Sequence, residues 1–210
     1  MPGEDQDAIG LDLVAPEMFA PVLRTLIWAA VGLGTGAALL SALWLTWPGA
    51  LAVGLAVAVP TIGYAVALRR RRMWLRGGVV HARTLFGTRT LDIAEATGVE
   101  LLVYPGRLSR IVLRLTARGE TRIVPLALYT DTGSGRELHV LGLRKLADAL
   151  AGTDLAAGVA VADVLVAQLR AEARDAALGE RPLYRGVRLV REKDAVQPVV
   201  LGDAEVAGLL

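Results

Sequence analysis

Apolar residues are concentrated in one long segment of this 210-residue chain. The 44 residues from Thr25 to Leu68 contain no Asp, Glu, Lys, Arg or His. An α-helix needs about 20 apolar residues to cross the hydrocarbon core of a bilayer, so the segment is long enough for two crossings. It is interrupted at Trp47-Pro48-Gly49 and followed by four consecutive arginines. The pattern predicts a transmembrane helical hairpin, with helices at about 22–47 and 49–68.

Small residues recur at helical spacing in both predicted helices. Gly32 and Gly36 form a GxxxG step in the first, and Ala50, Gly54 and Ala58 follow one another every four residues in the second. Such faces let two helix backbones approach closely. Because the connection between the helices is short, packing of the two faces within the hairpin is favoured over dimerisation. The glycine-rich stretch lacks the preceding strand that a nucleotide-binding loop requires.

Positive residues follow the second helix directly. Arg69, Arg70, Arg71, Arg72 and Arg76 lie in a basic juncture over residues 69–78. Lys and Arg stay on the cytoplasmic side of a membrane, so both chain ends are predicted to face the cytoplasm of a multi-pass protein of the cell membrane. The same arginines can attract anionic lipid headgroups at about 1 kcal/mol each. The topological role alone is sufficient to explain them.

The first 21 residues are acidic and show no sustained periodicity. They contain Glu4, Asp5, Asp7, Asp12 and Glu17 and no basic residue. We expect a flexible cytoplasmic tail here. A secretory signal peptide fits poorly, since its first part should be basic.

After residue 78 the spacing of apolar residues changes from helical to alternating, and short turns separate the segments. Ile111, Leu113 and Leu115 alternate with polar residues in the clearest segment, and Pro125 marks an edge or a bulge. Six strands and one helix are predicted within residues 79–151, at Val79–Phe86, Thr88–Ile93, Val99–Tyr104, Ser109–Ala117, Thr121–Tyr129, Arg136–Leu141 and Leu143–Leu150. Together they predict an α+β domain, a small antiparallel sheet or partial barrel capped by a helix.

A longer amphipathic helix is predicted over residues 152–178. Its apolar residues recur at steps of four and three, as in a heptad seam, but alanines at several seam positions and a widened apolar face favour packing against the protein's own sheet over a coiled coil. Residues 179–210 form a basic tail or covering segment, with brief strands at Val187–Val190 and Val199–Leu201.

The stretch "WLRGGVVHARTLFGTRTLDIAEATGVELL", which follows the hairpin and its basic juncture, resembles bacterial membrane proteins with a pleckstrin-homology-like (PH-like) domain. The resemblance covers Met73–Leu150 and is one of pattern. It implies a PH-like fold with seven strands and a membrane-tethered binding or scaffolding role, and it transfers no binding residue. The excess of Arg over Lys suggests a GC-rich bacterial genome, for instance that of an actinobacterium.

Residues with catalytic or metal-binding chemistry are sparse. The chain has no cysteine, which excludes a thiol nucleophile, a disulfide and a thiolate metal site. His81 and His139 lack the spacing of metal ligands. A triad of Ser109 or Ser134 with His139 and Asp131 has no nucleophile-elbow context. We therefore predict no catalytic residue, no metal and no cofactor.

One set of arginines on the predicted sheet could bind an anionic partner. On one sheet face they would form a basic surface, whose default role is contact with solvent and whose alternative is binding of phospholipid headgroups or an acidic protein. Nucleic acid is disfavoured because aromatic residues for base stacking are missing. These arginines are Arg107, Arg110, Arg114, Arg118 and Arg122.

The sequence thus favours a non-enzymatic, membrane-anchored cytoplasmic binding or scaffolding module. The alternative is an accessory subunit of a larger transporter or envelope-assembly complex, docked through the small faces at Gly32, Gly36 and Gly54. An enzyme is the least favoured hypothesis, since it would need a deep pocket with convergent polar groups.

Overall fold

The computed structural model describes residues 8–13, 16–70, 72–84 and 87–210, with the side chains of 16–19 left out. It has two long apolar helices followed by antiparallel sheets and C-terminal helices, an α+β arrangement. The chain divides into two compact units. One comprises residues 14–72 and 82–88, and the other comprises residues 1–13, 73–81 and 89–210.

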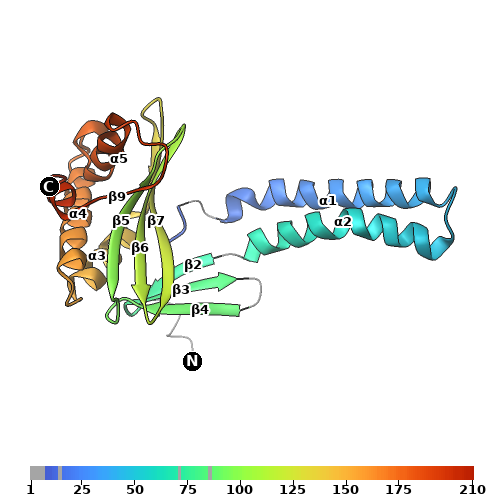
Figure 1. Cartoon of the computed structure of the whole chain (residues 1–210), viewed down its shortest axis with the longest axis horizontal. Helices are drawn as coiled ribbons and strands as arrows, with labels where there is room; N and C mark the ends of the chain where they lie inside the picture. Colours follow the sequence, from blue (N-terminus) through green and yellow to red (C-terminus); the bar gives the residue numbers. More distant parts are fainter. Residues whose placement is uncertain (1–7, 14–15, 71, 85–86) are drawn as a thin grey trace. The chain divides into compact units, whose positions relative to one another are not determined.

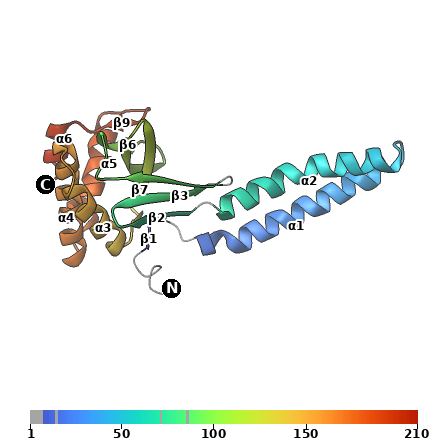
Figure 2. The ribbon, with the colours of Figure 1, turned by 90° about the horizontal axis from the view of Figure 1, so that it is seen from below.

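The two apolar helices, α1 (Pro16–Ser41) and α2 (Trp47–Arg70), lie side by side and antiparallel (Figures 1 and 2). Both are long and apolar enough to cross a membrane, and the 18-residue windows within Ala20–Ser41 and α2 have mean hydropathies of 1.5 and 2.1. The predicted helical hairpin is confirmed, but its connection is not at Trp47–Gly49. The chain turns at residues 42–46, and Pro48 lies in the first turn of α2, where its missing N–H would have no partner in any case.

The first sheet has the strand order β1-β2-β3-β4, comprising Ile9–Gly10, Arg72–Arg76, Val79–Thr84 and Gly87–Asp92. Gly77 and Gly78 connect β2 to β3 with φ of 56° and 81°, the left-handed conformation of a tight hairpin turn. Strand β2 lies in the predicted basic juncture, where no strand was expected. The expected strand at Val79–Phe86 ends at Thr84 in the described part, since residues 85–86 lie outside it.

The flexibility predicted for the acidic N-terminal tail, residues 1–21, is wrong for its described part. Ile9 and Gly10 pair with Leu75 and Trp74 of β2, Leu11 is fully buried, and α1 begins at Pro16. Ile9, Leu11 and Leu13 alternate with polar or small residues, a strand-like pattern too short to recognise among the acidic positions. Residues 1–7 lie outside the described part of the chain.

Leu11→Ala should lower the free energy of unfolding by about 2–3 kcal/mol. The value is at the low end for a buried leucine because a chain segment near its end can relax into the space left. Chemical denaturation of the full-length chain in detergent measures the effect, and Val196→Ala is the control because Val196 is 91% exposed. Equal stabilities of the two variants would mean that the N-terminal segment is not packed.

The second sheet has the order β8-β7-β6-β5-β9, comprising Gly135–Glu137, Glu120–Thr130, Leu108–Ala117, Gly98–Tyr104 and Val199–Val200. The register between β6 and β7 shifts at Ile111 and Val112, opposite Pro125, so the predicted bulge is confirmed. The strand expected at Arg136–Leu141 is shorter. It ends at Glu137, because His139 caps the helix that follows.

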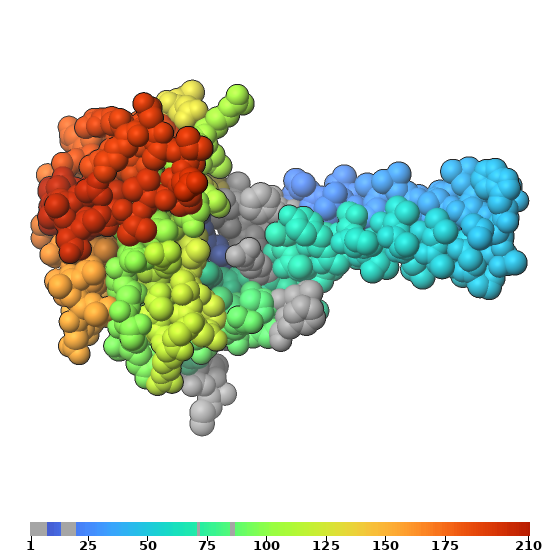
Figure 3. Space-filling model, viewed as in Figure 1, coloured from blue at the N-terminus to red at the C-terminus, as the bar shows by residue number. Residues whose placement is uncertain are grey.

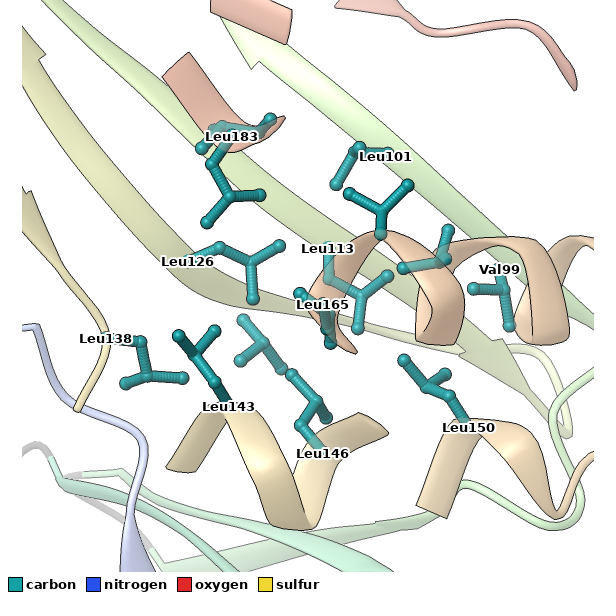
Figure 4. Close-up of a cluster of buried hydrophobic side chains, with 14 of the residues drawn as sticks. Val99, Leu101, Leu113, Leu126, Leu138, Leu143, Leu146, Leu150, Leu165 and Leu183 are labelled. Atoms are coloured by element: carbon teal, nitrogen blue, oxygen red, sulfur yellow. The ribbon is translucent and has the colours of Figure 1, made fainter. Parts of the chain in front are cut away.

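The C-terminal helices cover one face of the second sheet (Figures 1 and 2). Leu113 and Leu126 of the sheet face a row of leucines from two of these helices, Leu143, Leu146 and Leu165 among them (Figure 4). The helical elements are α3 (Val140–Ala151), α4 (Ala156–Ala173), the 3₁₀ turn η1 (Leu178–Glu180), α5 (Pro182–Glu192) and α6 (Asp203–Ala207).

Helix α4 packs against the protein's own core, as the sequence favoured over a coiled coil. Val161, Val164 and Leu165 are buried, whereas Val159 of the predicted seam is exposed. The brief strand at Val187–Val190 is wrong, because these residues lie in α5. Its buried side chains recur at helical spacing between arginines. The short strand expected at Val199–Leu201 is confirmed as β9.

Candidate functional site

The five arginines predicted to form one basic face do not share a face. Arg110 and Arg114 alternate along β6 and lie on the same side of the sheet. Arg122 pairs in register with Leu115, which is buried on the opposite side, and the Arg122 side chain is only 13% exposed. Directly opposite residues of an antiparallel pair project to the same side, so the sheet itself separates Arg122 from Arg110 and Arg114.

Glutamates neutralise most of this set. Arg114 forms an ion pair with Glu100 of β5, Arg118 with Glu95, and Arg122 with Glu120. The Arg110 guanidinium carbon lies 5.0 Å from the ring centroid of Tyr104, within cation–π range. Arg107 has no ion pair with any described residue. Because glutamates compensate the charges of three of these five arginines, the set does not form a free anion-binding face.

A different group of arginines converges at the end of α2. An open hollow of about 490 Å³ is lined by Val66, Arg69 and Arg70 of α2, Arg72 of β2 and Arg83 of β3. We call it the arginine hollow. Among the described residues, Arg69, Arg70 and Arg83 have no ion-pair partner and no Asp or Glu lines the hollow.

Of the predicted juncture, the structure therefore brings Arg69, Arg70 and Arg72 together. Arg76 does not line the hollow, and Arg71 lies outside the described residues. The sequence did not single out Arg83. The hairpin turn at Gly77–Gly78 reverses the chain and returns Arg83 beside residues that precede it by more than ten positions. The alternation of buried and exposed residues in β3 could have shown that Arg83 points outward. It could not have shown that Arg69, Arg70 and Arg72 lie beside it.

Close packing of the two long helices depends on Gly34 and Gly54. A Cβ added to Gly54 would lie 2.7 Å from the Gly34 carbonyl oxygen and 2.9 Å from the Ala38 Cβ. Packing within the hairpin is confirmed for Gly54. The assignment of Gly32 and Gly36 to this face is wrong, since nothing lies within 4 Å of a Cβ added at either position. Gly34 is two positions away from both Gly32 and Gly36, and residues two positions apart lie on different sides of a helix.

The residues considered for catalysis or metal binding are engaged in structural contacts. The Ser109 hydroxyl accepts hydrogen bonds from the Arg191 guanidinium at 2.9 and 3.1 Å, and Arg191 also pairs with Asp131 at 3.3 Å. His139 Nδ1 accepts the Leu141 N–H at 3.4 Å, capping α3. His81 stacks on Trp74 with ring centroids 5.3 Å apart. The described residues contain no group of three or more His, Asp or Glu that could hold a metal ion.

A buried polar network centres on Glu137. Its Oε1 accepts a hydrogen bond from the Tyr129 hydroxyl at 2.6 Å, and its Oε2 accepts one from Gln168 Nε2 and one from Arg181 Nη1, both at 2.8 Å. Gln168 in turn accepts the Leu183 N–H at 3.1 Å. Burial, and then the charge of Glu137, raises the pKa of Tyr129 above its ordinary value. With both oxygens engaged by the protein, this network cross-links the second sheet to α4 and α5.

No family model, curated protein or solved structure matches the chain. The arginine hollow and the exposed apolar helices are the features from which a function can be argued, since the Glu137 network is satisfied internally.

Proposed function

We propose that the chain is a non-enzymatic binding or scaffolding module, anchored in the cell membrane by α1 and α2, with its sheets and remaining helices in the cytoplasm. The observation that carries the proposal is the apolar surface of the two long helices. Only 17% of the residues in the most apolar window of each helix are buried. A core helix of a soluble protein would be covered by other elements, and soluble proteins rarely expose apolar patches of this size.

The outer surface of this pair suits a lipid environment. Trp28, Leu33 and Leu39 are each exposed by more than 60%, and the space-filling view shows the blue and cyan helices packed against each other (Figure 3). The hydroxyls of Thr25 and Thr35 donate to the carbonyl oxygens of Pro21 and Val31 at 3.1 and 2.9 Å. These bonds satisfy the hydroxyls where no water is present.

The ends of the helices support the orientation that we propose. Trp44 is 82% exposed and lies with Trp47 at the turn between the helices, where indole rings favour a membrane interface. Arg69 and Arg70 occupy the last turn of α2. By the positive-inside rule, the arginine end faces the cytoplasm and the tryptophan end faces outward.

A PH-like identity for the cytoplasmic part is also proposed. The described residues contain seven strands, β2 to β8, between α2 and α3. This number and the helix that follows them agree with what the sequence resemblance implies. The bacterial origin suggested by composition is part of the same proposal.

Fractionation and a topology reporter test this proposal. The full-length chain should remain in the membrane pellet without detergent. A reporter active only outside the cytoplasm should be inactive when fused to Leu210 and active when inserted in the turn at residues 42–46. Recovery of the chain in a high-speed supernatant, or an active reporter at Leu210, would contradict it.

A second candidate is an accessory subunit of a larger transporter or envelope-assembly complex. It is favoured by Gly32 and Gly36, which face away from α2 and leave room for a foreign helix. Gly36→Leu should then shift the detergent-extracted protein to a smaller species on native gels while leaving α1 and α2 paired. A wild-type protein that already migrates as a monomer would exclude this function.

A further inference from the structure

We propose that the arginine hollow binds a phosphate dianion, supplied either by a phospholipid whose headgroup ends in a phosphate monoester, such as phosphatidic acid, or by a soluble phosphate. The hollow is lined by Val66, Arg69, Arg70, Arg72 and Arg83, with a volume of about 490 Å³. Its location at headgroup level rests on the proposed membrane anchoring, whereas its charge and shape do not.

Three separate elements contribute positive charge to this one hollow. Arg69 and Arg70 end α2, Arg72 begins β2, and Arg83 lies near the end of β3. Like charges held together repel one another, and Arg69, Arg70 and Arg83 have no carboxylate partner among the described residues. A bound anion would relieve this repulsion.

The chemistry of the guanidinium group favours phosphate over carboxylate. Guanidinium groups donate paired, planar hydrogen bonds that match the oxygens of carboxylates and phosphates. A carboxylate offers two oxygens, whereas a phosphate monoester offers three strong acceptors and about −1.5 to −2 charges at neutral pH. Four arginines that line one hollow from three elements offer more donors than a carboxylate can accept, so they favour the second kind of ligand.

The hollow is also large enough for more than a bare ion. Its volume of about 490 Å³ is many times the ~30 Å³ that one water occupies in the liquid, so an esterified headgroup fits. Val66 lies on the same side of α2 as Arg69 and Arg70, because residues three and four positions apart are neighbours on a helix. The hollow therefore has an apolar side next to its charged groups, as a phospholipid would require.

Membrane topology alone does not explain the site. The positive-inside rule needs only basic residues near the end of α2, and Arg69 and Arg70 also stabilise the carbonyl end of that helix. Arg83 is in a strand that follows a hairpin turn and so does not stabilise the helix end, and the positive-inside rule does not require it to lie beside Arg69 and Arg70 in one hollow. Its position in the hollow is the observation that distinguishes a site from a basic juncture.

The test uses the full-length chain in nanodiscs, comparing Arg83→Gln with Arg89→Gln. Arg89 is an exposed arginine of β4 that does not line the hollow, so the two variants lose the same charge. In phosphatidylcholine discs that contain some phosphatidic acid, retention of phosphatidic acid is measured by native mass spectrometry. Arg83→Gln should weaken it by about tenfold and Arg89→Gln by less than about twofold.

A second arm identifies the source of the phosphate. Inorganic phosphate is titrated by ³¹P NMR against the same proteins in discs of phosphatidylcholine alone. Arg83-dependent binding in this arm assigns a soluble phosphate, and Arg83-dependent retention of phosphatidic acid without it assigns a lipid. Equal losses in the two variants, or binding in neither arm, would overturn the proposal. Should the chain prove soluble, the phosphate titration in buffer still tests the hollow while the membrane anchoring fails.

Discussion

The Glu137→Ala variant is expected to lose about 3–5 kcal/mol of unfolding free energy. The substitution leaves the Tyr129 hydroxyl, Gln168 Nε2 and Arg181 Nη1 without their acceptor, and it removes the carboxylate that pairs with the Arg181 charge. These groups are held between the second sheet, α4 and the start of α5, where little water reaches them. An uncompensated buried charge and two unpaired donors cost more than the loss of one exposed contact.

Denaturant unfolding of the full-length chain in detergent, followed by near-ultraviolet circular dichroism, measures this loss. Tyr129 and Tyr184 are in edge-to-face contact, with ring centroids 5.2 Å apart, so the signal reports the packing around the network. Glu100→Ala is the matched control, because Glu100 forms an exposed ion pair with Arg114 that should be worth less than about 1 kcal/mol. Similar losses in both variants would show that the network is accessible to solvent.

Gly54→Leu should separate α1 from α2, at a cost above about 3 kcal/mol. The atoms nearest an added Cβ are the Gly34 carbonyl oxygen and the Ala38 Cβ, at 2.7 and 2.9 Å. Neither can rotate away as a long side chain could, so the helix backbones themselves must move apart. The expected result is a hairpin that no longer packs, while both helices stay helical.

Disulfide trapping follows this separation, using cysteine pairs introduced across α1 and α2 away from the substituted position. Trapping should fail in Gly54→Leu and persist in Gly36→Leu, which adds the same side chain where nothing lies within 4 Å of the added Cβ. Efficient trapping in both variants would contradict close packing at Gly54.

Features that depend on a few neighbouring residues could be predicted from the sequence. The uncharged run gives two apolar helices, and the alternation of Ile111, Leu113 and Leu115 correctly places these three side chains in the core. The turn at Arg118-Gly119 is confirmed, with both residues at positive φ. In each case the period or the turn chemistry is contained within about ten residues.

Features that depend on distant contacts could not be predicted in the same way. Gly32 and Gly36 lie on one side of α1 and Gly34 on another, so the local spacing allows either side to face α2. Only the packing of α2 shows that Gly34 is at the contact. The side to which Arg122 points follows from its pairing with Leu115. Glu137 and Arg181 are 44 positions apart. No rule of local spacing connects such a pair.

Strand β1 meets its partner only after both long helices have been synthesised, because α1 and α2 lie between β1 and β2 in the chain. Joining two points across so long a loop is entropically costly, and the cost falls when the loop is already folded back on itself. The antiparallel helices bring the start of α1 near the end of α2 and so shorten the loop in advance. In a nascent chain whose helices have not yet paired, β2 keeps an open edge, which is the kind of edge that recruits other strands and begins aggregation.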